Sequence, residues 1–284
     1  MPEEWQISPG DQQTRYSGRR FRIAAKPHLF AQPLVYGIED SPEVQLVVSS
    51  PPSLADMLLC CELDAALLPT VDLCYASGFT VVPAGCVSSS GRSLTARVYS
   101  RVRPAKLTTL WADSESHTST ALAQVLWSHT YNSRLDIMPF SHESQDMAED
   151  AEAVLMIGDK VVTEPPLGFD WQVDLSSMWF EMTGLPFVFE VWAAADPDDC
   201  SELYRILSDS RRYGLDHLEE IARRHASLFD WPSDLANLFL SRQLQFEFGE
   251  AQREGMEEFL SMAAECGVID EHMPLRYYKP PVKV

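Results

Sequence analysis

The stretch DLSSMWFEMTGLPFVFEVW, residues 174–192, decides the fold of this chain. Its first half has the apolar spacing of a helix, which ends at Thr183-Gly184 and which Pro186 keeps from resuming. Residues 187–192 then form an almost continuous apolar, aromatic and β-branched run, with Glu190 as its one charge. A run this apolar predicts a strand buried on both faces, in a parallel or mixed sheet flanked by helices. We expect this segment to carry the chain from one lobe back to another.

The segments around this stretch alternate between strand and helix patterns, which indicates an α/β fold with a largely parallel sheet. A second α/β unit begins after Pro104. The sequence therefore predicts two lobes joined by two crossing strands, near 96–103 and 187–194. The predicted units are a flexible N-terminal extension at 1–20, a discontinuous first lobe at 21–103 and 187–284 that includes C-terminal helices, and a second lobe at 104–186.

Periodicity and breaker residues place the individual elements. The predicted strands are 21–25, 44–48, 64–68, 79–82, 94–102, 107–112 and 153–157. The predicted helices are 54–63 after an N-cap at Ser53, 118–130, 143–152, and four charged segments at 199–210, 213–228, 232–248 and 250–266.

Composition excludes several kinds of partner. The 284 residues carry a net charge of −20, with a sequence pI of about 4.6, so nucleic acid and anionic membrane surfaces are not expected partners. No apolar run reaches the roughly 18 residues of a membrane span, and the N-terminus has no apolar core of the secretory kind. The six cysteines form no CxxC pair and no metal-like cluster with histidine, so we expect reduced thiols, a cytoplasmic protein and no bound metal.

Polar residues follow several of the predicted strands, where open α/β sheets bind their ligands. The run Asp113 to Ser119 places four hydroxyls at the mouth of a helix, and the N–H groups there favour a carboxylate or phosphate. Simple capping of the helix by Ser116 or Thr118 is the alternative. The run Val87 to Ser93 combines hydroxyls with Arg92, which suits an acid group or a plain polar loop.

Four other residues are candidates on weaker grounds. Gly158 follows a buried strand and permits close approach of a ligand to the backbone. Asp159 is either a base, a helix cap or an acceptor for a hydroxyl. His28 and His117 lie in strand-end loops, where a histidine either titrates usefully near neutral pH or is simply solvated. No nucleotide, zinc-protease or hydrolase motif of the GxGxxG, P-loop, HExxH or GxSxG kind occurs.

Six sequence blocks resemble the chorismate dehydratases of the futalosine route of menaquinone biosynthesis. The blocks, in order, are PLVYG (33–37), ELDAALLP (62–69), VSSSG (87–91), SHTSTAL (116–122), LMIGD (155–159) and TGLPFVFEVW (183–192). The resemblance implies a two-lobed fold like that of type II periplasmic binding proteins, without an export signal. It also implies a lyase that removes water from chorismate to give 3-[(1-carboxyvinyl)oxy]benzoate, with no metal or organic cofactor.

The resemblance also assigns residues to the substrate. Carboxylates would be held by Ser88 and Ser89 and by the hydroxyls of Ser116, Thr118 and Ser119, and the second lobe's wall would contain Gly158 and Asp159. The family usually carries a Tyr-Leu-Asn-Thr run before the first Pro-Leu, and here Phe30 stands at the asparagine, a position that faces substrate. Phenylalanine cannot form the hydrogen bonds of that amide. The catalytic candidates are His28 and Asp159.

Three functions remain open at this point. The favoured one is a cofactor-independent carbon–oxygen hydro-lyase acting on chorismate. A sister enzyme of the same route, such as 1,4-dihydroxy-6-naphthoate synthase, would need a general base, with His28 or His117 as candidates. A cytoplasmic binding protein for an aromatic or cyclic acid would bind its ligand without turnover. In each case the partner is a small anionic ligand, and the C-terminal helices either pack on the first lobe or form a homodimer.

Overall fold

The structure is a computed structural model that describes residues 20–48, 51–74, 78–113, 116–140, 151–195, 197, 200–270 and 274–281. The predicted helix at 143–152 lies largely outside these residues, as does the predicted N-terminal extension apart from Arg20.

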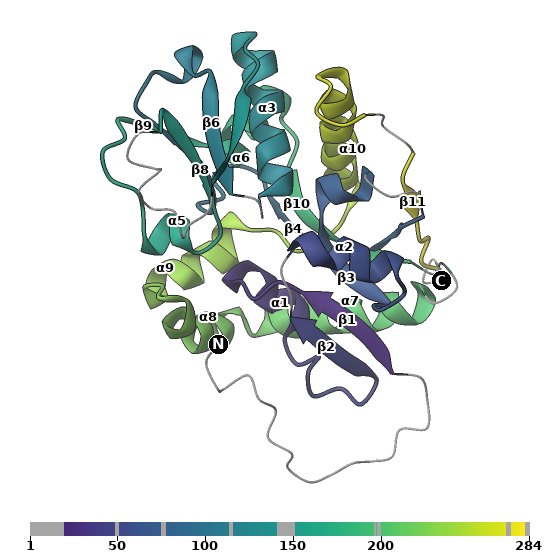
Figure 1. Cartoon of the computed structure of the whole chain (residues 1–284). Helices are drawn as coiled ribbons and strands as arrows, with labels where there is room; N and C mark the ends of the chain where they lie inside the picture. Colours follow the sequence, from purple (N-terminus) through teal and green to yellow (C-terminus); the bar gives the residue numbers. More distant parts are fainter. Residues whose placement is uncertain are drawn as a thin grey trace.

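Two β-sheets with helices around them form two lobes (Figure 1). We call the six-stranded sheet and its helices lobe 1, and the five-stranded sheet and its helices lobe 2. In spatial order, the lobe 1 strands are β11 (Arg276–Tyr277), β4 (Thr80–Ser89), β10 (Phe187–Ala194), β3 (Ala65–Pro69), β1 (Phe21–Ala25) and β2 (Val44–Val48). In spatial order, the lobe 2 strands are β7 (Asp136–Phe140), β6 (Thr109–Asp113), β8 (Ala153–Ile157), β5 (Ala96–Ser100) and β9 (Trp171–Asp174).

Helices connect and cover these strands. Those that follow lobe 1 strands are η2 (Leu29–Ala31), α1 (Gln32–Val35), α2 (Pro51–Leu59), η3 (Thr70–Cys74), α7 (Cys200–Asp216), α8 (Leu218–Ala226), η6 (Ser227–Phe229), α9 (Ser233–Leu238), the π-helical η7 (Phe239–Gln243) and α10 (Glu250–Glu265). Those of lobe 2 are η4 (Pro104–Lys106), α3 (His117–Tyr131), α5 (Lys160–Thr163) and α6 (Leu175–Thr183).

Strand β10 lies inside the lobe 1 sheet, as its apolar sequence predicts. It pairs antiparallel with both β3 and β4, whereas β1 pairs parallel with β2 and β3. Alternate residues of β10 enter two different hydrophobic cores, Val191 on one face and Trp192 on the other. The prediction of a mixed sheet covered on both faces is therefore confirmed.

The first crossing between the lobes lies earlier than the sequence predicts. The sequence predicts a crossing near 96–103, but β5 pairs antiparallel with β8 and β9 and so belongs to lobe 2. The crossing is made by residues 90–95, because β4 continues seven residues past its predicted end at Val82. The second crossing, predicted near 187–194, is made by residues 184–186 of the Gly-Pro turn, because all of β10 lies in the lobe 1 sheet.

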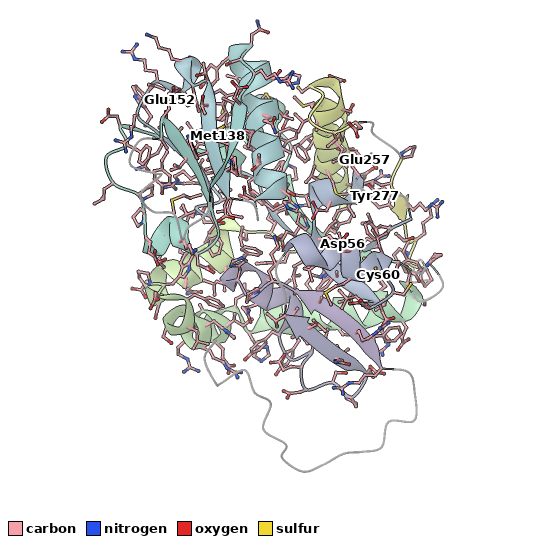
Figure 2. The ribbon with its side chains drawn as sticks, viewed as in Figure 1. Asp56, Cys60, Met138, Glu152, Glu257 and Tyr277 are labelled. Atoms are coloured by element: carbon pink, nitrogen blue, oxygen red, sulfur yellow. The ribbon has the colours of Figure 1, made fainter. Side chains whose placement is uncertain are left out.

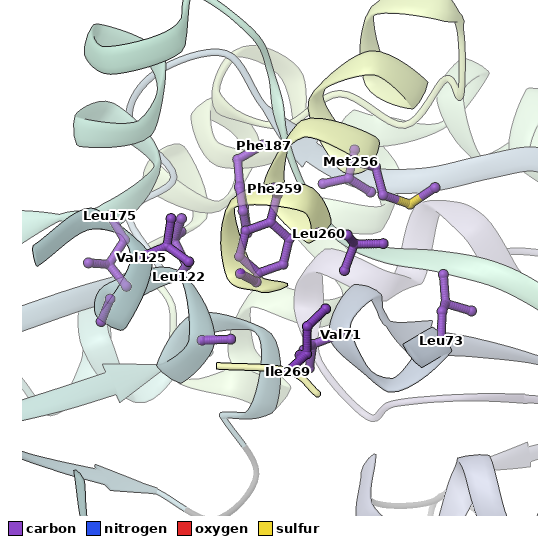
Figure 3. Close-up of a cluster of buried hydrophobic side chains, with 14 of the residues drawn as sticks. Val71, Leu73, Leu122, Val125, Leu175, Phe187, Met256, Phe259, Leu260 and Ile269 are labelled. Atoms are coloured by element: carbon purple, nitrogen blue, oxygen red, sulfur yellow. The ribbon is translucent and has the colours of Figure 1, made fainter. Parts of the chain in front are cut away.

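Helix α10 packs against both lobes. It contacts β10 of lobe 1 and α3 of lobe 2, and in Figure 1 it stands beside α3 above the lobe 1 sheet. Figure 3 shows its Phe259 and Leu260 among Leu122 and Val125 of α3 and Val71 of η3. One continuous hydrophobic core therefore spans the two lobes on this side of the molecule.

The last described strand, β11, belongs to the sheet of lobe 1. Strand β11 pairs in parallel with β4, Arg276 opposite Thr80. Burial and the nearby carboxylate of Glu257 raise the pKa of Tyr277, and the two side chains come from β11 and α10 (Figure 2). The C-terminal segment thus closes the edge of the sheet that β4 would otherwise expose.

Candidate functional site

A small cavity of about 50 Å³ lies between the two lobes. Its walls come from the ends of β1, β3 and β8, from the start of β5 and α3, and from β4 and β10. The lining residues are Lys26, His28, Phe30, Pro69, Val87, Thr95, Ala96, Ser116, His117, Thr118, Ser119, Ile157, Gly158, Phe189, Glu190 and Leu244. Three of the parallel-paired strands thus present their carboxyl ends to one space, which is where open α/β sheets bind ligands.

The first turn of α3 forms one wall of the cavity. Ser116, Thr118 and Ser119 line it and are almost fully buried. The side chain of Ser116 does not cap the helix, since its Oγ donates to the carbonyl of Asp113 at 2.5 Å and lies 2.7 Å from Oγ1 of Thr120. The first turn of a 15-residue helix therefore lines the cavity, and the side chain of its N-cap residue does not satisfy its first N–H groups. This arrangement suits a carboxylate or another anion.

His28 and Asp159 meet across the two lobes at the cavity wall. Nδ1 of His28 lies 3.2 Å from Oδ2 of Asp159, and Nε1 of Trp231 donates to Oδ1 of the same carboxylate at 2.8 Å. Because a carboxylate only accepts, Nδ1 of His28 is the donor, and Nε2 remains to interact with a ligand. Both oxygens of Asp159 are engaged, and Asp159 is not among the residues that line the cavity.

A second histidine–carboxylate pair joins the lobes near the start of α3. Nδ1 of His117 lies 2.7 Å from Oδ1 of Asp72, a residue of η3 that is 3% exposed. Beside it, the backbone N–H of Val71 donates to Oγ1 of Thr118 at 3.3 Å. These contacts hold lobe 2 against η3 and close this end of the cavity.

Lys26 and Glu190 form a buried ion pair in the wall of the cavity. Lys26 follows β1 directly and Glu190 lies in the middle of β10, and their side chains are 5% and 4% exposed. Sequence reasoning missed both residues as site candidates. The available signal was the single charge in an otherwise apolar buried strand, because a buried charge requires a partner.

Ser88 and Ser89 do not line the cavity, in contrast to the expectation that they hold a carboxylate. Both are buried within the long strand β4 rather than in a loop. The hydroxyl of Ser88 donates to the carbonyl of Gln245 at 3.1 Å, and that of Ser89 donates to the carbonyl of Gly91 at 3.2 Å. Their hydroxyls serve the backbone, and Val87 is the residue of this block that lines the cavity.

Gly158 and Phe30 occupy the cavity wall as expected. Gly158 has φ of +72°, and a Cβ atom added there would lie 3.4 Å from Cε1 of His28. A side chain at this position would therefore be strained and would crowd the His28 ring. The Phe30 ring lies 5.1 Å from that of His28, centroid to centroid, so an aromatic surface stands where the resembling family has an amide.

Nowhere in the described parts of the chain do three or more His, Cys, Asp or Glu side chains gather in a way that could hold a metal ion. No helix among them has both the length and the apolar character needed to cross a bilayer.

Two lobes, two crossing segments and a cavity between them define the class of periplasmic-binding-protein-like folds. Similar solved structures include a protein from Archaeoglobus fulgidus (TM-score 0.71, 16% identity, covering 89% of this chain and all of that one). They also include the periplasmic aliphatic sulphonate binding protein of Escherichia coli (TM-score 0.64, 11% identity, covering 94% and 96%). At these identities the likeness establishes the fold alone.

The chain belongs to the menaquinone biosynthesis family, whose sequence profile matches residues 21–265. A chorismate dehydratase from Thermus thermophilus is 35% identical over 92 residues. That alignment covers 26% of this chain and 34% of the relative, so it spans about a third of the relative's length.

Proposed function

We propose that this protein is a cofactor-independent carbon–oxygen hydro-lyase that converts chorismate to 3-[(1-carboxyvinyl)oxy]benzoate. In this proposal it acts in the cytoplasm, in the futalosine route of menaquinone biosynthesis. Family membership supports a role in menaquinone biosynthesis, and the dehydratase from Thermus thermophilus supports the reaction.

The observation that carries the proposal is the uncapped start of α3 in the wall of the cavity between the lobes. Chorismate is a dianion, and a protein with a net charge of −20 does not attract it at long range. It needs local donors instead, which the N–H groups of α3 and the hydroxyls of Thr118 and Ser119 would supply. Exclusion of water from the cavity by a bound ligand would strengthen each of these interactions.

The remaining walls suit a flat ring. Phe30 and Phe189 line the cavity and offer apolar faces to the cyclohexadiene of the substrate and to the aromatic product. Nε2 of His28, with Nδ1 held by Asp159, would contact a polar group of the ligand. Formation of the aromatic ring drives the reaction, so the protein's main task is alignment of the departing groups.

Incubation of the purified protein with chorismate, followed by mass spectrometry, tests the proposal. We expect chorismate to disappear and an aromatic enolpyruvyl ether, lighter by one water, to accumulate. A matched pair of variants checks the site: Thr118→Val, at the start of α3, should raise KM for chorismate, whereas Thr163→Val, at the end of α5 and outside the cavity lining, should not.

Phe30 favours one alternative, a binding protein for an aromatic acid, since it replaces a hydrogen-bonding amide with an aromatic surface. Chorismate would then raise the temperature of unfolding and be recovered unchanged. Recovery of intact chorismate at high protein concentration would contradict the dehydratase proposal.

A further inference from the structure

The first crossing between the lobes is attached at both of its ends to the start of α6. At its beginning, the hydroxyl of Ser176 donates to the carbonyl of Ser89, the last residue of β4, at 3.3 Å. At its end, the carboxylate of Asp174 accepts hydrogen bonds from the backbone N–H groups of Ser93 and Leu94 at 3.2 and 3.0 Å. The same helix ends directly before the second crossing, so α6 joins the two crossings.

Leu94, in the first crossing, has a backbone conformation that requires support. Its φ is +63°, in the left-handed region, which is unfavourable for a bulky residue with a Cβ atom. Its side chain packs against the hydrophobic core of lobe 1, whereas its N–H group is bound by Asp174 of lobe 2. Leu94 is therefore attached to both lobes, and the hydrogen bond to Asp174 offsets the cost of its conformation.

The residues that follow this crossing form part of the cavity wall. Thr95 and Ala96 line the cavity, and the carbonyl of Thr95 accepts a hydrogen bond from the N–H of Gly158 at 2.8 Å. Gly158 also lines the cavity and lies beside the ring of His28. The crossing therefore sets the position of this wall of lobe 2, although Asp174 itself does not line the cavity.

Capping of α6 alone does not explain the carboxylate of Asp174. The cap needs one acceptor, and Oδ1 provides it by accepting from the N–H of Ser177 at 3.1 Å. Oδ2 accepts from Leu94 instead, and Nη2 of Arg97 lies 3.9 Å from it. Asparagine and serine cap a helix about as well as aspartate does, but neither would cap α6 and also offer an acceptor at the position of Oδ2.

We infer that Asp174 is a positioning residue, which holds the first crossing, and with it Thr95 and Gly158, in the ligand-binding arrangement before a ligand enters. This role deepens the proposed function and rests on it. A wall that is already ordered removes a cost that ligand binding would otherwise include. Because a bound ligand would restore the wall, loss of the carboxylate should raise KM and leave kcat nearly unchanged.

The variant Asp174→Asn separates positioning from capping. Its amide oxygen can keep the cap, whereas its NH2 group would face the N–H of Leu94 and cannot accept from it. In steady-state kinetics with chorismate, KM should rise by roughly 10- to 100-fold, the factor for one lost hydrogen bond to a charged group, and kcat should stay within about threefold. Asp170→Asn, an exposed carboxylate just before β9, is the matched control and should change neither value.

Hydrogen exchange of the ligand-free protein tests the same role without turnover. In Asp174→Asn the N–H of Gly158 should exchange faster by about 2- to 10-fold, the factor for one ordinary hydrogen bond, because its acceptor on Thr95 is no longer fixed. The N–H of Ser177 should keep its wild-type rate, since the cap persists. Asp174→Ser, a second variant that keeps the cap and removes the second oxygen, should give the same exchange pattern and the same rise in KM.

The outcomes distinguish this inference from the proposed function. A wild-type KM in folded Asp174→Asn, or an unchanged exchange rate at Gly158, would overturn the positioning role, while turnover of chorismate by the wild-type protein would still support the proposed function. Equal acceleration at Gly158 and Ser177 would show that Asp174 is only a helix cap. Absence of turnover by the wild-type protein would overturn the proposed function, and the exchange pattern would then decide alone whether Asp174 holds the crossing.

Discussion

The two sides of the interlobe cavity are closed in different ways. On one side α3, α10 and η3 form a seam that is apolar apart from the contacts of His117 with Asp72 and of Thr118 with Val71. In this apolar seam Phe259 is fully buried and meets Trp179 and Phe187 edge-on at 6.1 and 5.0 Å between ring centroids. On the other side His28, Asp159 and Trp231 form a polar seam of two hydrogen bonds.

This difference indicates which contacts hold the lobes together and which contacts break more easily. Apolar burial on the scale of an aromatic side chain contributes several times the net value of one hydrogen bond. Opening for substrate entry should therefore occur at the polar seam, with the apolar seam as the fixed edge.

The largest expected effect is at the apolar seam. Phe259→Ala should lower the free energy of unfolding by about 3–5 kcal/mol, the range for removing a fully buried phenylalanine. Phe180→Ala on α6 is the control, because Phe180 is 38% exposed and should cost far less. Chemical denaturation followed by circular dichroism measures both, and a small loss for Phe259→Ala would contradict the view that this seam holds the lobes.

A second test concerns the contact between α10 and the second crossing. Gly255 faces the carbonyl oxygen of Pro186, and an added Cβ atom would lie 2.1 Å from it. Gly255→Ala should therefore destabilise the fold by about 1–3 kcal/mol through overpacking, although alanine favours helix. Glu254→Ala, exposed on the same helix, should leave stability within about 0.5 kcal/mol of the wild type. Stabilisation by Gly255→Ala would show that α10 does not press on the crossing.

At the polar seam, Asp159→Asn should lower the free energy of unfolding by about 1–2 kcal/mol. The reason is that Trp231, which is buried, and His28 would then donate to a neutral amide, a weaker acceptor than a carboxylate. The sharper readout is hydrogen exchange. Amides of β8 and α5 should exchange faster, while those of α3 and α10 keep the wild-type rate. Asp170→Asn, an exposed carboxylate in the same lobe, is the control. Equal acceleration on both sides of the cavity would contradict independent seams.

The sequence predicted the layout well because the relevant signals are local. Apolar periodicity and breaker residues located most strands and helices, and the strand-end rule brought His28, Ser116 and Gly158 to one cavity. These signals depend on neighbours within one or two turns, which a single sequence displays directly.

The misses share a physical cause, which is pairing between distant residues. Ser88 looked like a loop residue, but pairing with Val188 of β10 and a bridge to Gln245 keep it inside β4. The sequence shows Glu190 only as a single charge in an apolar strand and gives no sign of its partner. In the structure that partner is Lys26, and the two side chains form a buried ion pair. Contacts of this kind depend on tertiary structure, and periodicity does not reveal them.

The smallest expected effect concerns pH and the helices that support Trp231. Burial, with a contribution from Arg224, lowers the pKa of His225 on α8 to about 4, below its ordinary value of 6.5. Between pH 6.5 and about 4, His225 therefore binds a proton in the unfolded chain but not in the folded chain. The free energy of unfolding falls as the pH drops through this range. Because His225 is partly exposed, we expect a loss of only about 1 kcal/mol.

Denaturant melts at pH 7 and pH 5 measure this loss, and His225→Asn should remove His225's share of the difference. Hydrogen exchange at pH 5 then measures how far each of the two seams is loosened by acid. Because α8 packs against α9, next to Trp231, and α10 packs against α3, acid should loosen the polar seam before the apolar one. Earlier loosening of α10 than of α8 would reverse the order of strength proposed for the two sides.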